Sequence, residues 1–513
     1  MFNISSVYKN STATSYLILQ ARYKTKIHWS KLKKKTGPKY KALNHFDEFY
    51  GSVFGDKWQS MREALLRRSK YVAVVNNYGD TEETMEELTN RGAHCLRKLI
   101  SIQKEFNQQY DKAPTQEAVQ TDQQALRLQE YMEKQQSEEI YSIYPNTDNK
   151  PERLAMNDED YAVESDKKKE ELVTLPNRTL EESIAEARID ESRIIDPSLG
   201  ITTESLYQFL PATKLKGMDE WVPESLHYSY YSKDKDFPLV IEPETELTYP
   251  EHLKVFTYEM DSQSLSFPEP KRSQTGVFNY YPMDCGSVLT VLALGLNPGD
   301  RLLDLCSAPG GKALVALQTL LPDVVISNDV SISRSNRTMR TFCNYLIDFE
   351  TSNKWRERVI FKRIDGRMFV DDQGFDKVLV DVPCTTDRHS VNEDENSIFR
   401  PDRIRERLRI PEMQSQLLVN GLKLTKVGGS VVYSTCSLSP VQNDGVVHMA
   451  LKYAFETHGI VAAVKDMTAS MAGLSSTLVL ASDTARPKYG QLVTPSLGAN
   501  FGPSYIAKLV RVR

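Results

Sequence analysis

The sequence predicts an α/β fold built on a mostly parallel, doubly wound sheet. The first observation is that residues 302–320 read as a short apolar strand, a Gly-rich turn and a helix, the opening unit of a nucleotide-binding sheet. The second is that apolar strand candidates and helical segments alternate from there to residue 510. The third is that acidic residues and cysteines follow the strand candidates, at the carboxyl ends where such sheets bind ligands.

The opening unit is expected to bind a ligand. Residues 302–305 form its strand, Pro309, Gly310 and Gly311 its turn, and 312–320 its helix. Glycines let a ligand approach the main chain, and a helix N-terminus offers unpaired N–H groups to an anion. The turn is not a P-loop, because no glycine precedes Gly311 by five residues, and the G-x-G-x-x-G spacing of dinucleotide-binding turns is also missing.

A second strand, at 324–327, leads to Asp329, an acidic residue placed where ribose hydroxyls are bound. A compact turn followed by this carboxylate favours one nucleoside with a short charged tail, such as S-adenosylmethionine. The alternative is that Gly310 and Gly311 only turn the chain. Two later cysteine motifs agree with the cofactor interpretation.

Further strands are expected on the same sheet. Three of them end at acidic or hydroxyl residues: 359–363 at Asp365-Gly366, 377–380 at Asp381, and 429–433 at Ser434. A last apolar run, 505–510, could close the sheet edge. Helices are expected between the strands, for example at 333–345 and 413–424.

Composition divides the chain into five expected segments: a transit peptide at 1–36, a helical N-terminal region at 37–106, an acidic flexible linker at 107–197, a small α+β lobe at 198–287 and the catalytic sheet at 288–513. Residues 1–46 contain no Asp or Glu, which is typical of an organellar transit peptide, although a basic arm that touches RNA is the alternative. The linker is rich in charged residues and Gln and poor in aliphatics. The aromatic residues of 37–106 are expected in a core rather than as base-stacking platforms.

Bulk properties exclude several classes. The net charge of −5 gives no global attraction for nucleic acid, so RNA contacts must come from local patches or a partner. No apolar run is long enough for a membrane span. The six cysteines are irregularly spaced, which predicts neither a disulfide framework nor a metal site. We expect Cys285 and Cys306 to be buried thiols.

Two strand ends present the candidate chemistry: Asp381-Val382-Pro383-Cys384 and Ser434-Thr435-Cys436-Ser437. A thiolate is a suitable nucleophile for an electron-poor ring. Methylation of cytosine carbon 5 needs a thiolate that adds to carbon 6, an acid near the ring nitrogen, and a proton acceptor for the carbon 5 proton. The target cytosine must also be unstacked before it can reach these groups. Two thiols, the Asp381 carboxylate and a cofactor turn meet these needs. The spacing leaves open which thiol attacks.

The chain resembles the Sun family of RNA cytosine-5 methyltransferases. The motifs that carry the resemblance are 304–312, 381–384 and 434–437, and four stretches are similar to the mitochondrial branch that modifies small-subunit ribosomal RNA: 42–49, 212–217, 380–390 and 500–505. The resemblance spans most of 40–105 and 200–513. It implies a Rossmann-like S-adenosylmethionine-dependent methyltransferase sheet, with the small α+β lobe and the helical N-terminal region added to it.

The resemblance also implies roles for single residues. Cys436 would be the covalent nucleophile and Cys384 would help to release the product. The implied cofactor contacts are Gly310, Gly311 and Lys312 at the methionine end, Asp329 at the ribose with Arg334 nearby, Asp365 and Gly366 at the adenine, and Asp381 between cofactor and target base. Met283 stands where many relatives carry Gln, and the acidic linker has no counterpart. Arg388 and His389 either touch RNA phosphate or lie in a solvated loop.

The resemblance implies a location in the mitochondrial matrix and a role in ribosome assembly, on ribosomal RNA and mitochondrial ribosomal subunits. It further implies a heterodimer with a helical-repeat protein of the mitochondrial termination-factor type, which would supply RNA affinity to a negatively charged chain. Two alternatives stay open. One is an RNA-bound assembly factor whose catalysis is dispensable, and the other is a DNA cytosine-5 methyltransferase that uses Cys384.

Overall fold

The computed structural model describes residues 37–110, 237–262, 266–482 and 485–513. The expected transit peptide, nearly all of the expected acidic linker and the 212–217 stretch lie outside the described residues. None of the helices in the described ranges is long and apolar enough to cross a bilayer.

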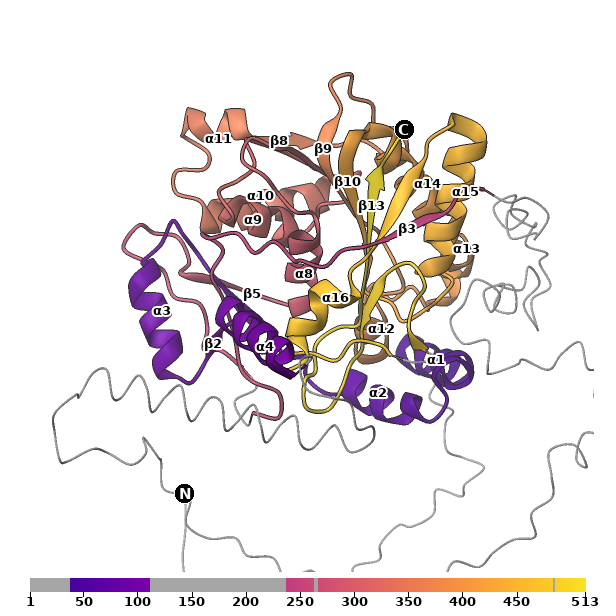
Figure 1. Cartoon of the computed structure of the whole chain (residues 1–513), viewed down its shortest axis with the longest axis horizontal. Helices are drawn as coiled ribbons and strands as arrows, with labels where there is room; N and C mark the ends of the chain where they lie inside the picture. The colour runs from indigo at the N-terminus through magenta and orange to yellow at the C-terminus, as the bar shows by residue number, and fades with distance from the viewer. Residues whose placement is uncertain (1–36, 111–236, 263–265, 483–484) are drawn as a thin grey trace, which may run out of the picture.

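The main sheet has nine strands in the described part of the chain, and it confirms the predicted α/β fold (Figure 1). Its order is β3 (Val240–Pro243), β11 (Ala462–Asp466), β13 (Ser504–Arg511), β10 (Thr425–Thr435), β9 (Phe375–Asp381), β6 (Arg301–Asp304), β7 (Val324–Asn328) and β8 (Val359–Lys362), and β12 (Gln491–Val493) pairs with β13. Strands β10, β9, β6, β7 and β8 run parallel to one another. Their carboxyl ends therefore lie at one edge, as predicted.

The last strand is not at the edge, so that expectation was wrong. β13 runs antiparallel between β10 and β11, and β3 pairs with β11 beyond it. The reason is that two short segments extend the sheet further. β3 had been expected in the small lobe, and Ala462–Asp466 is too short and too polar at its end to predict a strand.

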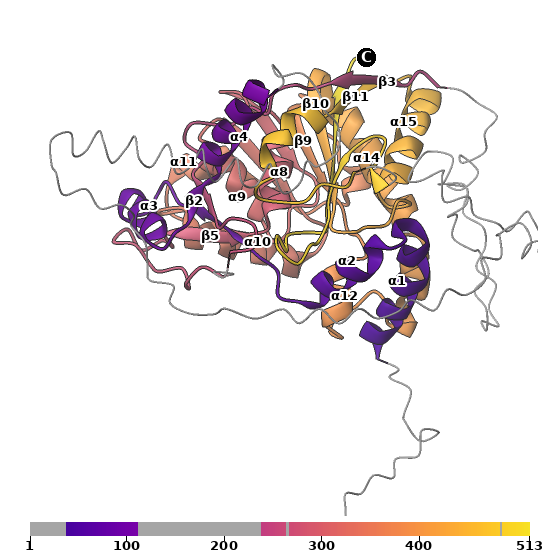
Figure 2. The ribbon, with the colours of Figure 1, turned by 60° about the horizontal axis from the view of Figure 1, so that its bottom comes forward.

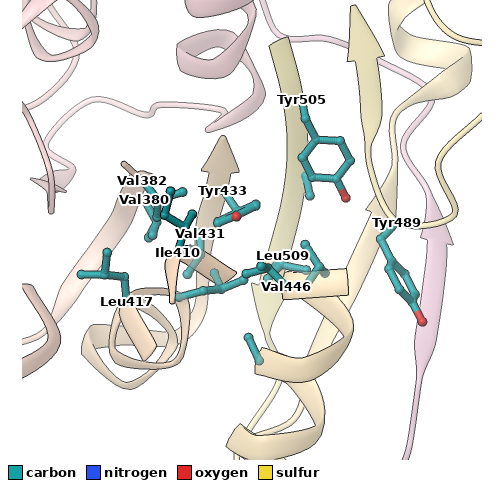
Figure 3. Close-up of a cluster of buried hydrophobic side chains, with 14 of the residues drawn as sticks. Val380, Val382, Ile410, Leu417, Val431, Tyr433, Val446, Tyr489, Tyr505 and Leu509 are labelled. Atoms are coloured by element: carbon teal, nitrogen blue, oxygen red, sulfur yellow. The ribbon is translucent and has the colours of Figure 1, made fainter. Parts of the chain in front are cut away.

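Helices cover both faces of the sheet (Figure 1). One face carries α8 (Cys285–Ala293), α9 (Gly311–Gln318), α10 (Ile332–Tyr345) and α11 (Asn353–Arg358). The other carries α14 (Ile410–Leu424) and α15 (Asp444–His458), with α13 (Ile404–Leu408) leading into them. Figure 3 shows this second interface, where Val380, Val431 and Tyr433 of the strands meet Leu417 and Val446 of the helices. Burial of such apolar surface is the main stabilising term of the fold.

A second sheet forms the small lobe, but its strands come from both sides of the undescribed segment. Its order is β2 (His94–Cys95), β4 (Val255–Thr257), β1 (Val72–Val75) and β5 (Tyr280–Met283), with α3 (Thr81–Asn90) and α4 (Leu96–Tyr110) beside it. Residues 72–95 had been assigned to a separate helical unit. The difference arises because β1 is an apolar run of four residues, too short to distinguish the periodicity of a strand from that of a helix. Its partner strands are also distant in sequence.

The first two helices, α1 (Pro38–Phe54) and α2 (Lys57–Leu66), pack on the catalytic domain near α12 (Asp387–Asn392), as Figure 2 shows. Phe46, Tyr50 and Trp58 are buried in the same hydrophobic core as the main sheet. Their rings contact one another, with Phe46 and Tyr50 stacked at 4.9 Å. The predicted core role of these aromatic residues is confirmed.

Candidate active site

The Gly-rich turn lies between β6 and α9, where it was predicted. Gly310 precedes α9 with φ +96°, a left-handed conformation that favours glycine. A Cβ at Gly310 would lie 2.7 Å from Thr338 Cγ2, so a larger residue has no room against α10. The N-terminus of α9 has no side-chain cap, which leaves its first N–H groups for a ligand.

A buried acid that the sequence analysis did not assign to the site stands just before this turn. Asp304 is 1% exposed, and among the described residues its carboxyl group has at most the backbone N–H of Cys306 as a hydrogen-bond donor. Burial, reinforced by the nearby charge of Asp381, raises the pKa of Asp304 to about 8. A buried carboxylate with so few donors is costly, and a cationic or N–H-bearing ligand group would relieve that cost. Its position at the end of a strand before a Gly-rich turn was the available signal.

Asp381 is held between the turn and the second cysteine motif. Lys312 Nζ lies 2.7 Å from Asp381 Oδ2, and Ser434 Oγ donates to Asp381 Oδ1 at 2.6 Å. Asp381 and Ser434 are register partners on β9 and β10. Burial alone lowers the pKa of Lys312, but the Asp381 carboxylate and the Cys436 sulfur outweigh burial and hold that pKa above its usual range. Lys312 of the Gly-rich turn and Ser434, two residues before Cys436, therefore both contact Asp381.

The two thiols meet across neighbouring loops. The backbone N–H of Cys436 donates to Cys384 Sγ at 3.3 Å, and the N–H of Thr386 donates to the same sulfur at 3.4 Å. The hydrogen bond with the Cys436 side chain, together with burial, raises the pKa of Cys384 well above its usual range. Cys384 therefore holds its proton more tightly than an ordinary thiol and is hydrogen-bonded to its neighbour.

A cavity of about 510 Å³ opens beside Cys436. It lies within the usual size of a small-ligand pocket. Cys436 contributes to its lining and Cys384 does not. Other walls come from Asp284 and Ser287 at the start of α8, the loop 502–504, α12, and the segment 66–71 that joins α2 to β1. Of the two thiols, Cys436 is thus the one that a ligand in this cavity reaches.

A buried acid, Asp387, ties the two cysteine loops to the N-terminal helix. Its carboxylate accepts hydrogen bonds from Tyr50 Oη (2.7 Å), Leu438 N (2.7 Å), Thr385 Oγ1 (2.5 Å) and Ser437 Oγ (3.1 Å). Its own N–H donates to the carbonyl of Cys436 at 3.1 Å. Burial raises the pKa of Asp387, and these donors oppose that effect. Asp387 lies in the 380–390 stretch, but nothing in the sequence indicated that Tyr50 is its partner.

The residues expected at the ribose and adenine lie at the carboxyl ends of β7 and β8. Asp329 is buried and pairs with Arg334 at 3.2 Å. Asp365 pairs with Arg367 at 2.7 Å, and the hydrogen bond from Arg367 lowers the pKa of Asp365. Gly366 has little room for a side chain, because a Cβ there would lie 2.7 Å from Leu417 Cδ2. The two loops are adjacent, since Asn328 Nδ2 donates to the carbonyl of Ile364.

Arg388 lies at the cavity wall and is held by contacts within the protein, so the solvated-loop alternative was wrong. Its guanidinium donates to the carbonyls of Gly502, Ala64 and Arg67 and to Asn500 Oδ1. It is therefore an internal clamp, which the sequence could not reveal because its partners are over 100 residues away. His389 is exposed at the cavity wall.

Two of the other four cysteines were expected to be buried thiols. Cys285 is buried as predicted, while Cys306 is only half-buried. Burial raises the pKa of both, which makes them unreactive thiols. Within the described ranges, no group of three His, Cys, Asp or Glu residues is arranged to hold a metal ion.

Known proteins resemble this chain along its length. Residues 291–485 match the family described as 16S rRNA methyltransferase RsmB/F. The chain is 33% identical over 509 residues to the 5-cytosine rRNA methyltransferase nsun-4 of Caenorhabditis elegans, covering 96% of this chain and 98% of that one. It is 30% identical to the 5-cytosine rRNA methyltransferase NSUN4 of Xenopus laevis, covering 96% and 95%. Over 263 residues it is 44% identical to NSUN4 of Bos taurus, covering 51% of this chain and 67% of that one.

Proposed function

The chain belongs to the family of 5-cytosine rRNA methyltransferases, and on that premise we propose that it methylates a cytosine of mitochondrial small-subunit ribosomal RNA through a covalent bond to Cys436. The observation that carries this proposal is the arrangement of the two thiols. Cys436 lines the cavity, and Cys384 lies behind it as its hydrogen-bonded neighbour.

The residues around the turn fit S-adenosylmethionine, the cofactor of this family. Asp304 offers a buried carboxyl group that lacks a side-chain hydrogen-bond partner in the described structure, and Gly310 leaves the main chain open to a close approach. Asp304 and the turn would hold the charged methionine end, and Asp329 the ribose. When bound, the cofactor supplies an electrophilic methyl group.

Cys436 is proposed to act as the nucleophile. As a thiolate, it forms a bond to carbon 6 of the cytosine, and the electron pair displaced from the ring moves toward N3 and makes carbon 5 nucleophilic. Asp381 is proposed to lie beside this path, and the hydrogen bonds that its carboxylate accepts from Lys312 and Ser434 fix its orientation. An aspartate in this position stabilises the negative charge that develops at N3 when it donates or relays a proton to that nitrogen.

Cys384 is proposed to complete the reaction. Its pKa is raised mainly by the neighbouring Cys436. Once the Cys436 sulfur is bonded to carbon 6 it no longer accepts a hydrogen bond in the same way, so the pKa of Cys384 falls, its thiol gives its proton to water, and a thiolate is left. That thiolate takes the carbon 5 proton, the bond between Cys436 and carbon 6 breaks, and the methylated base is released.

The test is bisulfite sequencing of mitochondrial ribosomal RNA from cells that lack the protein, rescued with the wild type or with Cys436→Ala. The proposal predicts one protected cytosine that disappears without the protein, returns with the wild type and stays absent with Cys436→Ala. A site that returns with Cys436→Ala would favour the DNA-type mechanism, in which Cys384 attacks. A normal methylation pattern in cells without the protein would favour an assembly role without catalysis.

The location and the partner complete the proposal. Residues 1–46 carry basic but no acidic side chains, which supports import into the mitochondrial matrix. The net charge of −5 supports a partner that supplies part of the RNA affinity, and a termination-factor-type helical-repeat protein bound at the ribosomal subunit has that property. Co-purification of the full chain from mitochondria, with and without RNase, tests both points. Recovery of this partner after RNase treatment is expected, and its absence would contradict a direct heterodimer.

A further inference from the structure

One wall of the cavity beside Cys436 is the segment 66–71, whose main chain is fixed from behind. Asn500 Nδ2 donates to the carbonyls of Ala64 and Arg68 at 2.9 and 3.0 Å, and the N–H of Lys70 donates to the carbonyl of Asn500 at 2.9 Å. Arg388 donates to the carbonyls of Ala64 and Arg67 at 3.0 Å each. The backbone polar groups on the inner side are therefore engaged, and the segment is rigid.

Lys70 of this segment is buried and donates to the carbonyl of Glu259, whereas the other side chains of the segment line the cavity. Arg67, Arg68 and Tyr71 are exposed and line the cavity together with Cys436. Tyr71 remains 39% exposed, so its ring is accessible from the cavity that it lines. Arg67 pairs with Glu63, but both side chains are more than half exposed, so this pair costs little to exchange. Arg68 has no ion-pair partner among the described residues.

We propose that segment 66–71 is an RNA-binding arm that holds the single-stranded nucleotides flanking the target cytosine. Tyr71 stacks on a flanking base, and Arg67 and Arg68 bind the adjacent phosphates. The inference rests on the proposed function, because a cytosine that reaches Cys436 must leave its stack and expose the faces of its neighbours. Aromatic side chains and arginines are the groups that bind such unstacked single-stranded RNA.

The position of the arm links RNA binding to the chemistry. Its main chain is held by Arg388 and by Asn392, which donates to the carbonyl of Leu65 at 3.0 Å, and both residues lie on α12. That helix begins three residues after Cys384, and its first N–H is bonded to the carbonyl of Cys436. A nucleotide bound to the arm is therefore placed against the same short helix that fixes both thiols. The net charge of −5 gives no global attraction for RNA, so any contact that this chain makes without its partner depends on local sites of this kind.

The arm is tested by RNA binding of the full chain. The probe is a short single-stranded RNA with one central cytosine, and its Kd is measured by fluorescence anisotropy over a series of salt concentrations. Tyr71→Ala should raise the Kd about ten-fold, whereas Tyr71→Phe keeps the ring and should bind like the wild type. Arg68→Ala should reduce the slope of log Kd against log salt by about 0.7, the value for one lost phosphate contact on a single strand. A wild-type Kd for Tyr71→Ala, or an unchanged slope for Arg68→Ala, would overturn the proposal.

The control is Arg356→Ala on α11, which lies far from α12 in both views of the ribbon (Figures 1 and 2) and should leave the slope unchanged. Unaltered S-adenosylmethionine affinity shows that each variant is folded. If the wild type methylates RNA and the arm variants bind normally, the arm is refuted and the enzyme assignment stands. If the arm variants weaken RNA binding but no methylation or adduct is seen with the wild type, the assignment fails and the arm stands. Variants that lose a protein partner while binding RNA normally would make this surface a protein interface and refute the proposal.

Discussion

The hydrogen bond between Tyr50 and Asp387 should contribute measurably to stability, because it joins a helix near the start of the chain to the two cysteine loops. Tyr50→Phe removes only the hydroxyl, and the ring keeps its contacts with Phe46 and Trp58. The hydroxyl donates at 2.7 Å to a fully buried carboxylate. Hydrogen bonds to charged groups contribute about 1.5–3 kcal/mol, so we expect the free energy of unfolding to fall by about 2 kcal/mol.

The assay is urea unfolding, with Tyr249→Phe as the matched control. Tyr249 has a buried hydroxyl without a hydrogen-bond partner in the described structure, so removing that hydroxyl should leave stability unchanged or slightly higher. A double-mutant cycle with Asp387→Asn isolates the pair, and a coupling energy of about 1–2 kcal/mol is expected for residues in direct contact. Equal effects of Tyr50→Phe and Tyr249→Phe, or a coupling energy near zero, would refute the reasoning.

Two further predictions concern the Gly-rich turn. Because the pKa of Asp304 is raised to about 8, the folded protein holds this proton more tightly than the unfolded chain; the stability from this group is complete below about pH 4 and is lost as pH rises through about 8. Asp304→Asn should therefore flatten the fall in unfolding free energy between about pH 4 and pH 8, and parallel wild-type and variant curves would contradict this. Gly310→Ala places a Cβ 2.7 Å from Thr338 at φ +96°, which should destabilise the protein by about 1–3 kcal/mol and weaken S-adenosylmethionine binding measured by calorimetry. Unchanged affinity and stability would show that the turn tolerates a side chain.

The parts of the site that could be predicted are those encoded in short stretches. The strand, turn and helix around Gly310 are contiguous, and their apolar pattern and glycines determine them locally. The meeting of Asp381 with Ser434 followed from a general property of parallel sheets, in which the ends of neighbouring strands lie at one edge. Cys384 and Cys436 could be placed together for the same reason.

The parts that could not be predicted depend on contacts between distant residues. Tyr50 and Asp387 are 337 residues apart, and Arg388 reaches Ala64 across 324 residues. Periodicity and composition carry no information about such pairs. For the same reason β1 appeared to belong to a helical unit, although it pairs with β4 and β5 from beyond the undescribed segment. Asp304 was overlooked although it ends a strand before the Gly-rich turn, because its complete burial is visible only in three dimensions.

The most direct test of the covalent mechanism is to incubate the Cys384→Ala variant with the RNA substrate and S-adenosylmethionine and to look for a denaturation-resistant protein–RNA band. Without the Cys384 thiol, nothing removes the carbon 5 proton, so the bond between Cys436 and carbon 6 should persist. A slower band should then accumulate on a denaturing gel. The double variant Cys384→Ala with Cys436→Ala should show none. A band that survives loss of Cys436, or no band from Cys384→Ala when the wild type methylates the same RNA, would contradict the assignment of the two thiols.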